Sequence, residues 1–273
     1  MQDFQLHSEF EATGDQPKAI AALQEGIAAE KKHQILMGVT GSGKTFTMAN
    51  LIAKTNRPTL VVAPNKTLAA QLFTELKELF PHNTVGFFIS YYDYYQPEAY
   101  IPGSDTYIAK DSSINDDIDK MRHAATQGLF ERPDSIIVAS VSCIYGMGSP
   151  ASYAKLCVKI SCGEEIARND LLKKLIEIQY SRNDMSLERG TFRVRGDVVD
   201  ILPSHQTNQA IRLEFFGDEV ESISLIDVLT SKTLKSIDAL SIYPNSHYVT
   251  EKSDMKDLVK EILHDLGTVS YTH

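Results

Sequence analysis

The amino-acid sequence predicts an α/β fold: a phosphate-binding loop on a parallel sheet, a β-hairpin inserted into that domain, and a smaller α+β module after it. Three observations lead to this prediction. Residues 38–45 read G-V-T-G-S-G-K-T and satisfy the phosphate-loop pattern G-x-x-x-x-G-K-[ST]. Apolar strand patterns alternate with helical ones up to about residue 141, as in parallel sheets. Beyond about residue 150 the strands become short and antiparallel in pattern.

The phosphate loop is predicted to lie between a strand and a helix. Residues 34–37 form an apolar run typical of a buried strand, and residues 46–54 have a helical pattern. Glycine accepts positive φ, so the backbone can fold around phosphate oxygens with its N–H groups facing the anion. In such loops the lysine, here Lys44, reaches the β- and γ-phosphates, and the hydroxyl of Thr45 ligates Mg²⁺.

A helix is predicted from about residue 16 to about residue 30, with Thr13 or Asp15 as its cap and Pro17 in its first turn. Gln16 lies about 22 residues ahead of the phosphate loop and follows an aromatic residue. Its amide can both donate to and accept from an adenine edge. It can equally be an ordinary first-turn residue, and its chemistry alone favours neither reading.

The rest of the parallel sheet follows in order. Strands are predicted at 57–64, 85–90 and 135–141, and helices at 65–80, capped by Asn65, and from about 116 to 132. Three aspartates crowd the first turn of the last helix and could suggest a metal site. The helix dipole, which favours negative charge at this end, is the preferred explanation. The three residues are Asp116, Asp117 and Asp119.

A tyrosine-rich stretch interrupts this pattern. Residues 91–108 hold six of the chain's 12 tyrosines together with two prolines, and a parallel crossover needs no such insertion. Alternating Tyr and Ile predict two extended arms with a bend near 102–105. The hairpin could pack on its own domain. Its tyrosine density and placement favour a projecting hairpin whose rings stack on bases or wedge into a duplex.

Bulk properties limit the function. An apolar content of 42% and a charged content of 23% are typical of a soluble globular protein, and no apolar run approaches membrane-spanning length. The N-terminus lacks a signal-peptide pattern. Cys143, Cys157 and Cys162 have no C-x-x-C spacing, which predicts a reducing cytoplasm, no zinc site, and cysteines acting as small buried or half-buried hydrophobes. A net charge of −9 requires any nucleic-acid site to be a local patch.

The second module is predicted to contain a helix at 169–179 and strands within 190–203 and 210–219. Arg193 and Arg195 share one strand face by alternation, and Arg182 is near in sequence. These arginines form either a docking or phosphate-binding surface or a plain solvated face. Residues 218–221 match the acidic D-E-x-x motif of ATPases, but they follow a Gly-Asp turn signal in an antiparallel hairpin, so we reject them as the magnesium-binding acids.

Several segments together resemble the UvrB family, the damage-verifying subunits of bacterial nucleotide excision repair, which have a RecA-like superfamily 2 helicase fold. The similarity extends over nearly the whole chain. The tyrosine stretch Y-Y-D-Y-Y-Q-P-E-A-Y is its most specific part. The segments that carry it are 13–17, 38–45, 63–72, 91–100, 140–146 and 192–197.

The resemblance implies specific partners and roles. The partners would be ATP with Mg²⁺, damaged double-stranded DNA, UvrA, and UvrC through regions outside this sequence, with no membrane. Lys44 and Thr45 would be catalytic, with Thr45 holding Mg²⁺ through ATP, and Gln16 would read adenine. ATP contacts would come from Gly38, Val39, Thr40, Gly41, Ser42, Gly43, Lys44 and Thr45. The DNA or its hairpin would be contacted or locked by Tyr91, Tyr92, Tyr94, Tyr95, Glu98, Tyr100, Tyr107, Lys110 and Arg122. UvrA would dock on Arg182, Arg193 and Arg195.

The resemblance also sets the expected domain organisation. A RecA-like ATP-binding domain is expected over 1–150 with its hairpin at about 91–114, a UvrA-interaction domain over 151–248, and the start of a returning helix over 249–273. UvrB proteins are more than twice as long, and their Walker B acids and second RecA-like domain would lie beyond residue 273. We therefore expect a truncated fragment, with a non-native end after residue 267, that binds nucleotide weakly and hydrolyses almost none.

Overall fold

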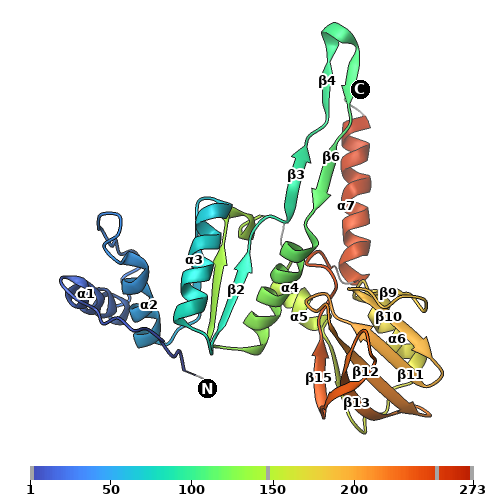
Figure 1. Cartoon of the computed structure of the whole chain (residues 1–273). Helices are drawn as coiled ribbons and strands as arrows, with labels where there is room; N and C mark the ends of the chain where they lie inside the picture. Colours follow the sequence, from blue (N-terminus) through green and yellow to red (C-terminus); the bar gives the residue numbers. More distant parts are fainter. Residues whose placement is uncertain (1–2, 146–147, 250–251, 271–273) are drawn as a thin grey trace. The chain divides into compact units, whose positions relative to one another are not determined.

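The structure is a computed structural model that describes residues 3–145, 148–249 and 252–270. It divides into two compact units, residues 1–145 and 146–273 (Figure 1). Within the described residues, no helix is long and apolar enough to cross a membrane. The first unit contains, in order, α1 (Gln16–Ala28), α2 (Lys44–Thr55), β1 (Thr59–Val62), α3 (Lys66–Leu79), β2 (Thr84–Phe88), β3 (Tyr92–Gln96), β4 (Ala99–Ile101), η1 (Pro102–Ser104), β5 (Thr106–Ile108), β6 (Asp111–Ile114), α4 (Asp116–Glu131), β7 (Ser135–Ala139) and η2 (Val141–Cys143).

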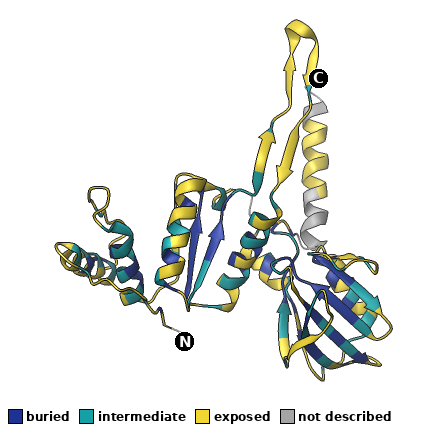
Figure 2. Ribbon diagram, viewed as in Figure 1, coloured by how far each residue is buried: buried dark blue, intermediate teal, exposed yellow. Residues whose placement is uncertain are grey.

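The predicted parallel sheet is confirmed, with the strand order β1-β7-β2 and both pairings parallel. The central strand β7 is buried on both faces, as a strand covered by helices must be. Ile136 and Val138 pack on one side with Leu76 of α3, whereas Ile137 packs on the other side with Ala125 of α4. Helices α3 and α4 therefore cover the two faces of β7 (Figure 2), while Leu60 and Val62 of the edge strand β1 stay exposed.

The prediction of a strand at 34–37 was wrong. The structure assigns no regular element there, and the side chains of Ile35 and Met37 are 86% and 88% exposed. A strand needs a neighbour to satisfy its N–H and C=O groups, and none of the described strands pairs with this segment. Instead, the side-chain amide of Gln34 donates to the carbonyl of Leu23 in α1, 3.1 Å away.

The tyrosine-rich stretch forms the predicted hairpin. Strand β3 pairs antiparallel with β6, and β4 pairs antiparallel with β5 further out. The bend falls at η1 and ends at Asp105, whose φ of 49° lies in the left-handed region that Asp tolerates better than most residues. The two arms project from the body of the first unit, and nearly all their residues are exposed (Figures 1 and 2).

The second unit is an α+β module, as predicted. A six-stranded sheet has the order β14-β13-β12-β11-β10-β9, and a separate two-stranded sheet pairs β15 with β8. The elements are α5 (Pro150–Lys155), β8 (Val158–Ser161), α6 (Arg168–Glu177), β9 (Ser181–Arg182), β10 (Thr191–Arg195), β11 (Val198–Leu202), β12 (Gln209–Phe216), β13 (Glu219–Asp227), β14 (Thr233–Ser236), β15 (Ala239–Ile242) and α7 (Lys252–Ser270).

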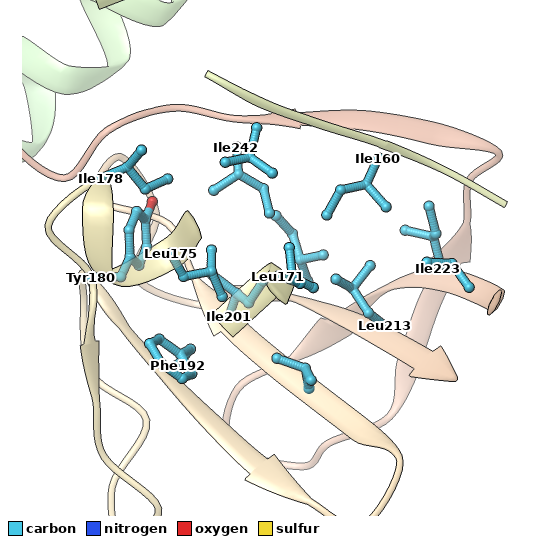
Figure 3. Packing of buried hydrophobic residues seen from close by; sticks show 14 of the residues in the cluster. Ile160, Leu171, Leu175, Ile178, Tyr180, Phe192, Ile201, Leu213, Ile223 and Ile242 are labelled. Atoms are coloured by element: carbon cyan, nitrogen blue, oxygen red, sulfur yellow. The ribbon is translucent and has the colours of Figure 1, made fainter. Parts of the chain in front are cut away.

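This unit has its own core between α6 and the large sheet. Leu171 and Leu175 of α6 meet Phe192, Ile201 and Leu213 of the strands, all of them fully buried (Figure 3). Alternate residues of the central strand β12, Ile211, Leu213 and Phe215, enter this core, as expected of a strand covered on one face, whereas the edge strands β14 and β9 are exposed throughout.

Two further predictions need correction. Helix α7 continues through Gly267 to Ser270 and does not break after residue 266, because a single glycine weakens a helix without ending it. Cys162 is exposed, and its thiol donates to the carbonyl of Ile237, whereas Cys143 and Cys157 are half-buried as predicted. Cys162 stands just after β8, where the chain turns outward at Gly163.

Candidate nucleotide and nucleic-acid sites

The phosphate loop has the backbone that anion binding needs. Gly41 and Gly43 have φ of 81° and 73°, and α2 begins directly after them at Lys44. A helix N-terminus and free loop N–H groups attract negative charge. Lys44, the first residue of α2, places its ammonium 2.8 Å from the carbonyls of both Gly38 and Val39. The residues therefore fit a phosphate group, and Lys44 already lies inside the loop.

Gln16 belongs to the same site. Its side-chain nitrogen donates to the carbonyl of Ser42 at 3.1 Å, and its side-chain oxygen accepts from the backbone N–H of Thr13 at 3.1 Å. A Cβ at Gly43 would collide with this amide, so the close approach requires glycine there. The amide thus joins α1 to the phosphate loop. Neither Thr13 nor Asp15 caps α1 with its side chain, as the sequence had suggested.

The hairpin presents aromatic side chains to solvent. Tyr94, Tyr95, Tyr100 and Tyr107 are 49–67% exposed, whereas Tyr91 and Tyr92 at the base are half-buried. The exposed rings bury little area on this protein, so their apolar faces remain available to stack on another flat group. Glu98 and Lys110 are also exposed on the arms, and the Lys110 ammonium lies 5.6 Å from the ring centroid of Tyr95.

The outermost tyrosines form a pair across the hairpin. Tyr100 and Tyr107 are directly opposite each other in the β4–β5 register, so both rings lie on one face. The hydroxyl of Tyr100 donates to the carboxylate of Asp105 at 2.8 Å, and this hydrogen bond raises the pKa of Tyr100. The end of the hairpin therefore presents two tyrosine rings on one face, and the hydroxyl of Tyr100 is tied to the bend at Asp105.

Arg122 holds the base of the hairpin. It is 2% exposed, and its guanidinium lies 3.9 Å from the ring centroid of Phe88 and 4.9 Å from that of Tyr91. One terminal nitrogen also donates to the carbonyl of Ile89 at 2.7 Å. Arg122 was expected to contact DNA or to lock the hairpin, and its buried contacts with Tyr91 and Ile89 favour the locking role.

Charge on the hairpin limits how it can bind. Residues 91–114 contain four carboxylates and one ammonium, a net charge of −3 (one minus four). Phosphates would be repelled by this surface, so affinity for a nucleic acid would have to come from ring stacking. The five charged residues are Asp93, Glu98, Asp105, Lys110 and Asp111.

The structure separates the three arginines predicted for docking. Arg182 and Arg195 are exposed, and Arg182 makes an ion pair with Asp184 at 2.8 Å. The side chain of Arg193 is only 11% exposed and pairs with Asp200 at 2.8 Å. Asp200 is also paired with Arg212 at 2.7 Å. Arg193 is therefore committed to the sheet, while Arg182 and Arg195 are accessible to a partner.

Sequence reasoning missed the residues that tie the hairpin to the domain. The ammonium of Lys66 donates to the carbonyl of Tyr92 at 2.6 Å, and the side-chain amide of Asn115 donates to Asp93 at 2.9 Å. Asn115 could have been noticed as the residue before an acidic helix start, which is a typical N-cap position. Nothing in the sequence signals the role of Lys66, because its partner is a backbone carbonyl 26 residues away.

Comparisons with known proteins agree with these features. Residues 158–248 match the family model described as UvrB interaction domain, and residues 9–138 match the model described as type III restriction enzyme, res subunit. Three relatives each carry the name UvrABC system protein B. The chain is 56% identical to that of Nitratidesulfovibrio vulgaris strain DP4 over 97% of its length, and 57% identical to those of Clostridium botulinum strain Langeland and Geobacillus kaustophilus over 97% and 96%.

A parallel sheet enclosed by helices and carrying a phosphate loop defines a RecA-like, helicase-type α/β protein. Within that class, identity of more than half over almost the whole sequence is decisive: the chain belongs to the UvrB family. It spans about two fifths of the length of the curated relatives it matches, 39% and 40% for those named first.

Proposed function

We propose that this chain serves UvrABC excision repair as the part of a UvrB protein that binds ATP, probes DNA with its tyrosine hairpin and docks UvrA. The observation that carries the proposal is the identity of 56–57% to UvrABC system protein B over 97% of the chain. UvrC recruitment and damage verification belong to the proposal for the whole protein.

The phosphate loop would bind the triphosphate of MgATP. Lys44 would exchange its two backbone carbonyl acceptors for β- and γ-phosphate oxygens, and the Thr45 hydroxyl would hold Mg²⁺. Gln16 would orient the loop through Ser42 and would meet the adenine edge with the amide donor and acceptor positions that Ser42 and Thr13 leave unused. ATP supplies the phosphoanhydride whose turnover drives such proteins.

A second candidate function is a binding module without ATPase activity. None of the three described parallel strands is followed by a carboxylate, since β1 leads to Ala63-Pro64, β2 to Ile89-Ser90 and β7 to Ser140-Val141. Asp218 lies in the turn between β12 and β13 of the second unit, where Gly217 has a φ of 64°, and so does not follow a parallel strand. The described residues thus supply half of a hydrolytic site.

Lys44→Ala tests the nucleotide site. Removing the ammonium should weaken MgATP binding by about 10-fold or more, because a charge-assisted contact to phosphate is worth about 1.5–3 kcal/mol. Lys54→Ala, at the exposed end of the same helix, should bind as the wild type does. Equal affinity in all three proteins, measured by calorimetry, would contradict the site. Turnover that Lys44→Ala abolishes would rule out the second candidate function for this chain.

Arg195→Ala tests the docking surface. Because Arg195 is exposed, its loss should weaken capture of UvrA several-fold without lowering the thermal stability of the second unit. Lys235→Ala, a basic exposed residue on β14 of the same sheet, is the matched control. Arg193→Ala should also weaken docking, but with a loss of stability, because it breaks the pair with Asp200. Unchanged UvrA affinity in both arginine variants would refute the assignment.

A further inference from the structure

Strand β3 contains a bulge that changes which tyrosines share a face of the hairpin. Tyr92 pairs with Ile114 and Tyr94 pairs with Ser113, so two positions on β3 match one step on β6. Asp93 is the extra residue. A bulge of this kind changes which residues share a face of the strand.

The side-chain contacts show the consequence. The rings of Tyr92 and Tyr95 lie 5.7 Å apart on one face, although regular alternation would put residues three apart on opposite faces. The hydroxyl of Tyr94 donates to the side chain of Gln96 on the other face. Without the bulge Tyr92 would share a face with Tyr94 instead, and the ring pair at the hairpin base would be lost.

Asn115 clasps the bulge from the neighbouring helix. Its side-chain nitrogen donates to the Asp93 carboxylate at 2.9 Å, and its backbone N–H donates to the carbonyl of Tyr91 at 2.8 Å. Its side-chain oxygen accepts from the N–H of Ile118 at 3.0 Å and so caps α4. One side chain therefore fixes both the start of the helix and the extra residue of the bulge.

We propose that Asp93 and Asn115 are positioning residues for DNA discrimination: their hydrogen bond holds the bulge that places the rings of Tyr92 and Tyr95 on one face of the hairpin. This inference rests on the DNA-probing function proposed above and adds two residues to it. Neither side chain needs to touch DNA. Rings that stack on bases must be held at a defined angle. If the hydrogen bond that holds the bulge is lost, the affinities for damaged and undamaged duplexes should become similar.

Four substitutions separate positioning from plain folding. Asn115→Asp keeps an oxygen to cap α4 but loses the amide donor and puts a second carboxylate beside Asp93. Asn65→Asp is its matched control, because Asn65 caps α3 in the same way through the N–H of Leu68 at 2.8 Å. Asp93→Ala removes the acceptor. Asp93→Asn retains an acceptor oxygen and should therefore behave as the wild type does. Asn115→Asp and Asp93→Ala change the net charge in opposite directions, so a defect that they share is not a charge effect.

The first measurement needs no DNA. Hydrogen exchange of the whole 273-residue chain should speed up about five-fold in peptides covering 91–97 and 110–116 for Asn115→Asp and Asp93→Ala, the effect of losing roughly one net hydrogen bond. Asn65→Asp and Asp93→Asn should exchange as the wild type does. Wild-type exchange in Asn115→Asp and Asp93→Ala would overturn the role of this pair in holding the bulge.

The second measurement is the ratio of affinities for a duplex bearing a bulky fluorescein adduct and the unmodified duplex. Asn115→Asp and Asp93→Ala should each lower this ratio about five-fold, whereas Asp93→Asn should leave it at the wild-type value. Suppose that Tyr95→Ala binds DNA more weakly than the wild type does. Faster hydrogen exchange with an unchanged affinity ratio in Asn115→Asp and Asp93→Ala would then overturn the role of this pair in DNA discrimination but not the proposed function of the hairpin. Binding that Tyr95→Ala leaves unaltered would overturn the proposed hairpin function and this inference together.

Discussion

At the scale of single residues, Asp200 on β11 joins its two neighbouring strands, because it pairs with Arg193 of β10 and with Arg212 of β12. It is buried on the sheet between Arg193 and Arg212, and both pairs have good hydrogen-bond geometry. Burial alone would raise the pKa of Asp200, but the hydrogen bonds from Arg212 and Arg193 outweigh it and hold the pKa below its usual value. The carboxylate of Asp200 therefore balances the charges of Arg193 and Arg212, which both pair with it. Arg195 on the same strand as Arg193 stays exposed.

Replacing Asp200 by Asn should lower the free energy of unfolding by about 2–4 kcal/mol, because it leaves two arginines without their shared counter-ion. A lowered carboxyl pKa stabilises the fold above the unfolded value of about 4, and this contribution is lost as pH falls through the folded pKa. The gap between the wild type and Asp200→Asn in urea titrations should thus be constant above about pH 5 and shrink below about pH 4. Asp218→Asn, at an exposed turn, should stay within about 0.5 kcal/mol of the wild type. A gap that persists unchanged at pH 3 would count against the paired carboxylate.

At the scale of elements, the hairpin should bind DNA with little dependence on salt. Its net charge of −3 offers no phosphate neutralisation, so its contribution comes from exposed rings. Tyr95→Ala should weaken duplex binding by about 1–3 kcal/mol, and by nearly the same factor at low and high salt. Tyr248→Ala, which removes a ring that is 54% exposed in the second unit, serves as the control. A Tyr95 effect that disappears at high salt, in anisotropy titrations, would show that charge and not stacking carries the contact.

The sequence predicted individual helices and strands better than it predicted the long-range contacts between them. The hairpin, its bend, helices α3 and α4 and the antiparallel module follow from local signals such as alternation, caps and turn residues. The bulge at Asp93 depends on a contact with Asn115, 22 positions along the chain, and no local pattern encodes that contact. The strand expected at 34–37 failed for the same reason. An apolar run is a strand only if another strand lies beside it, and that is a property of the tertiary fold.

At the scale of the whole molecule, each unit carries its own core. The first gathers Leu76, Phe80 and Ile136 around the parallel sheet, and the second gathers Phe192 and Leu213 under α6. The nucleotide loop therefore belongs to one core and the arginine surface to the other. Damage to one core should leave the site on the other intact, since burial of apolar area is what stabilises each unit.

Leu76→Ala and Leu213→Ala form a matched pair for this idea. Both leucines are fully buried, so each truncation should cost about 3–5 kcal/mol from the lost transfer free energy and the cavity that remains. Leu213→Ala should lower the unfolding temperature of the second unit and weaken UvrA capture at 37 °C while leaving MgATP affinity at the wild-type level. Leu76→Ala should lower the unfolding temperature of the first unit and weaken MgATP binding, while leaving UvrA capture at the wild-type level. Calorimetric scans with and without MgATP resolve the two transitions, because only the unit that binds the nucleotide gains stability from it. A single transition that both substitutions shift equally would mean that the two cores unfold as one.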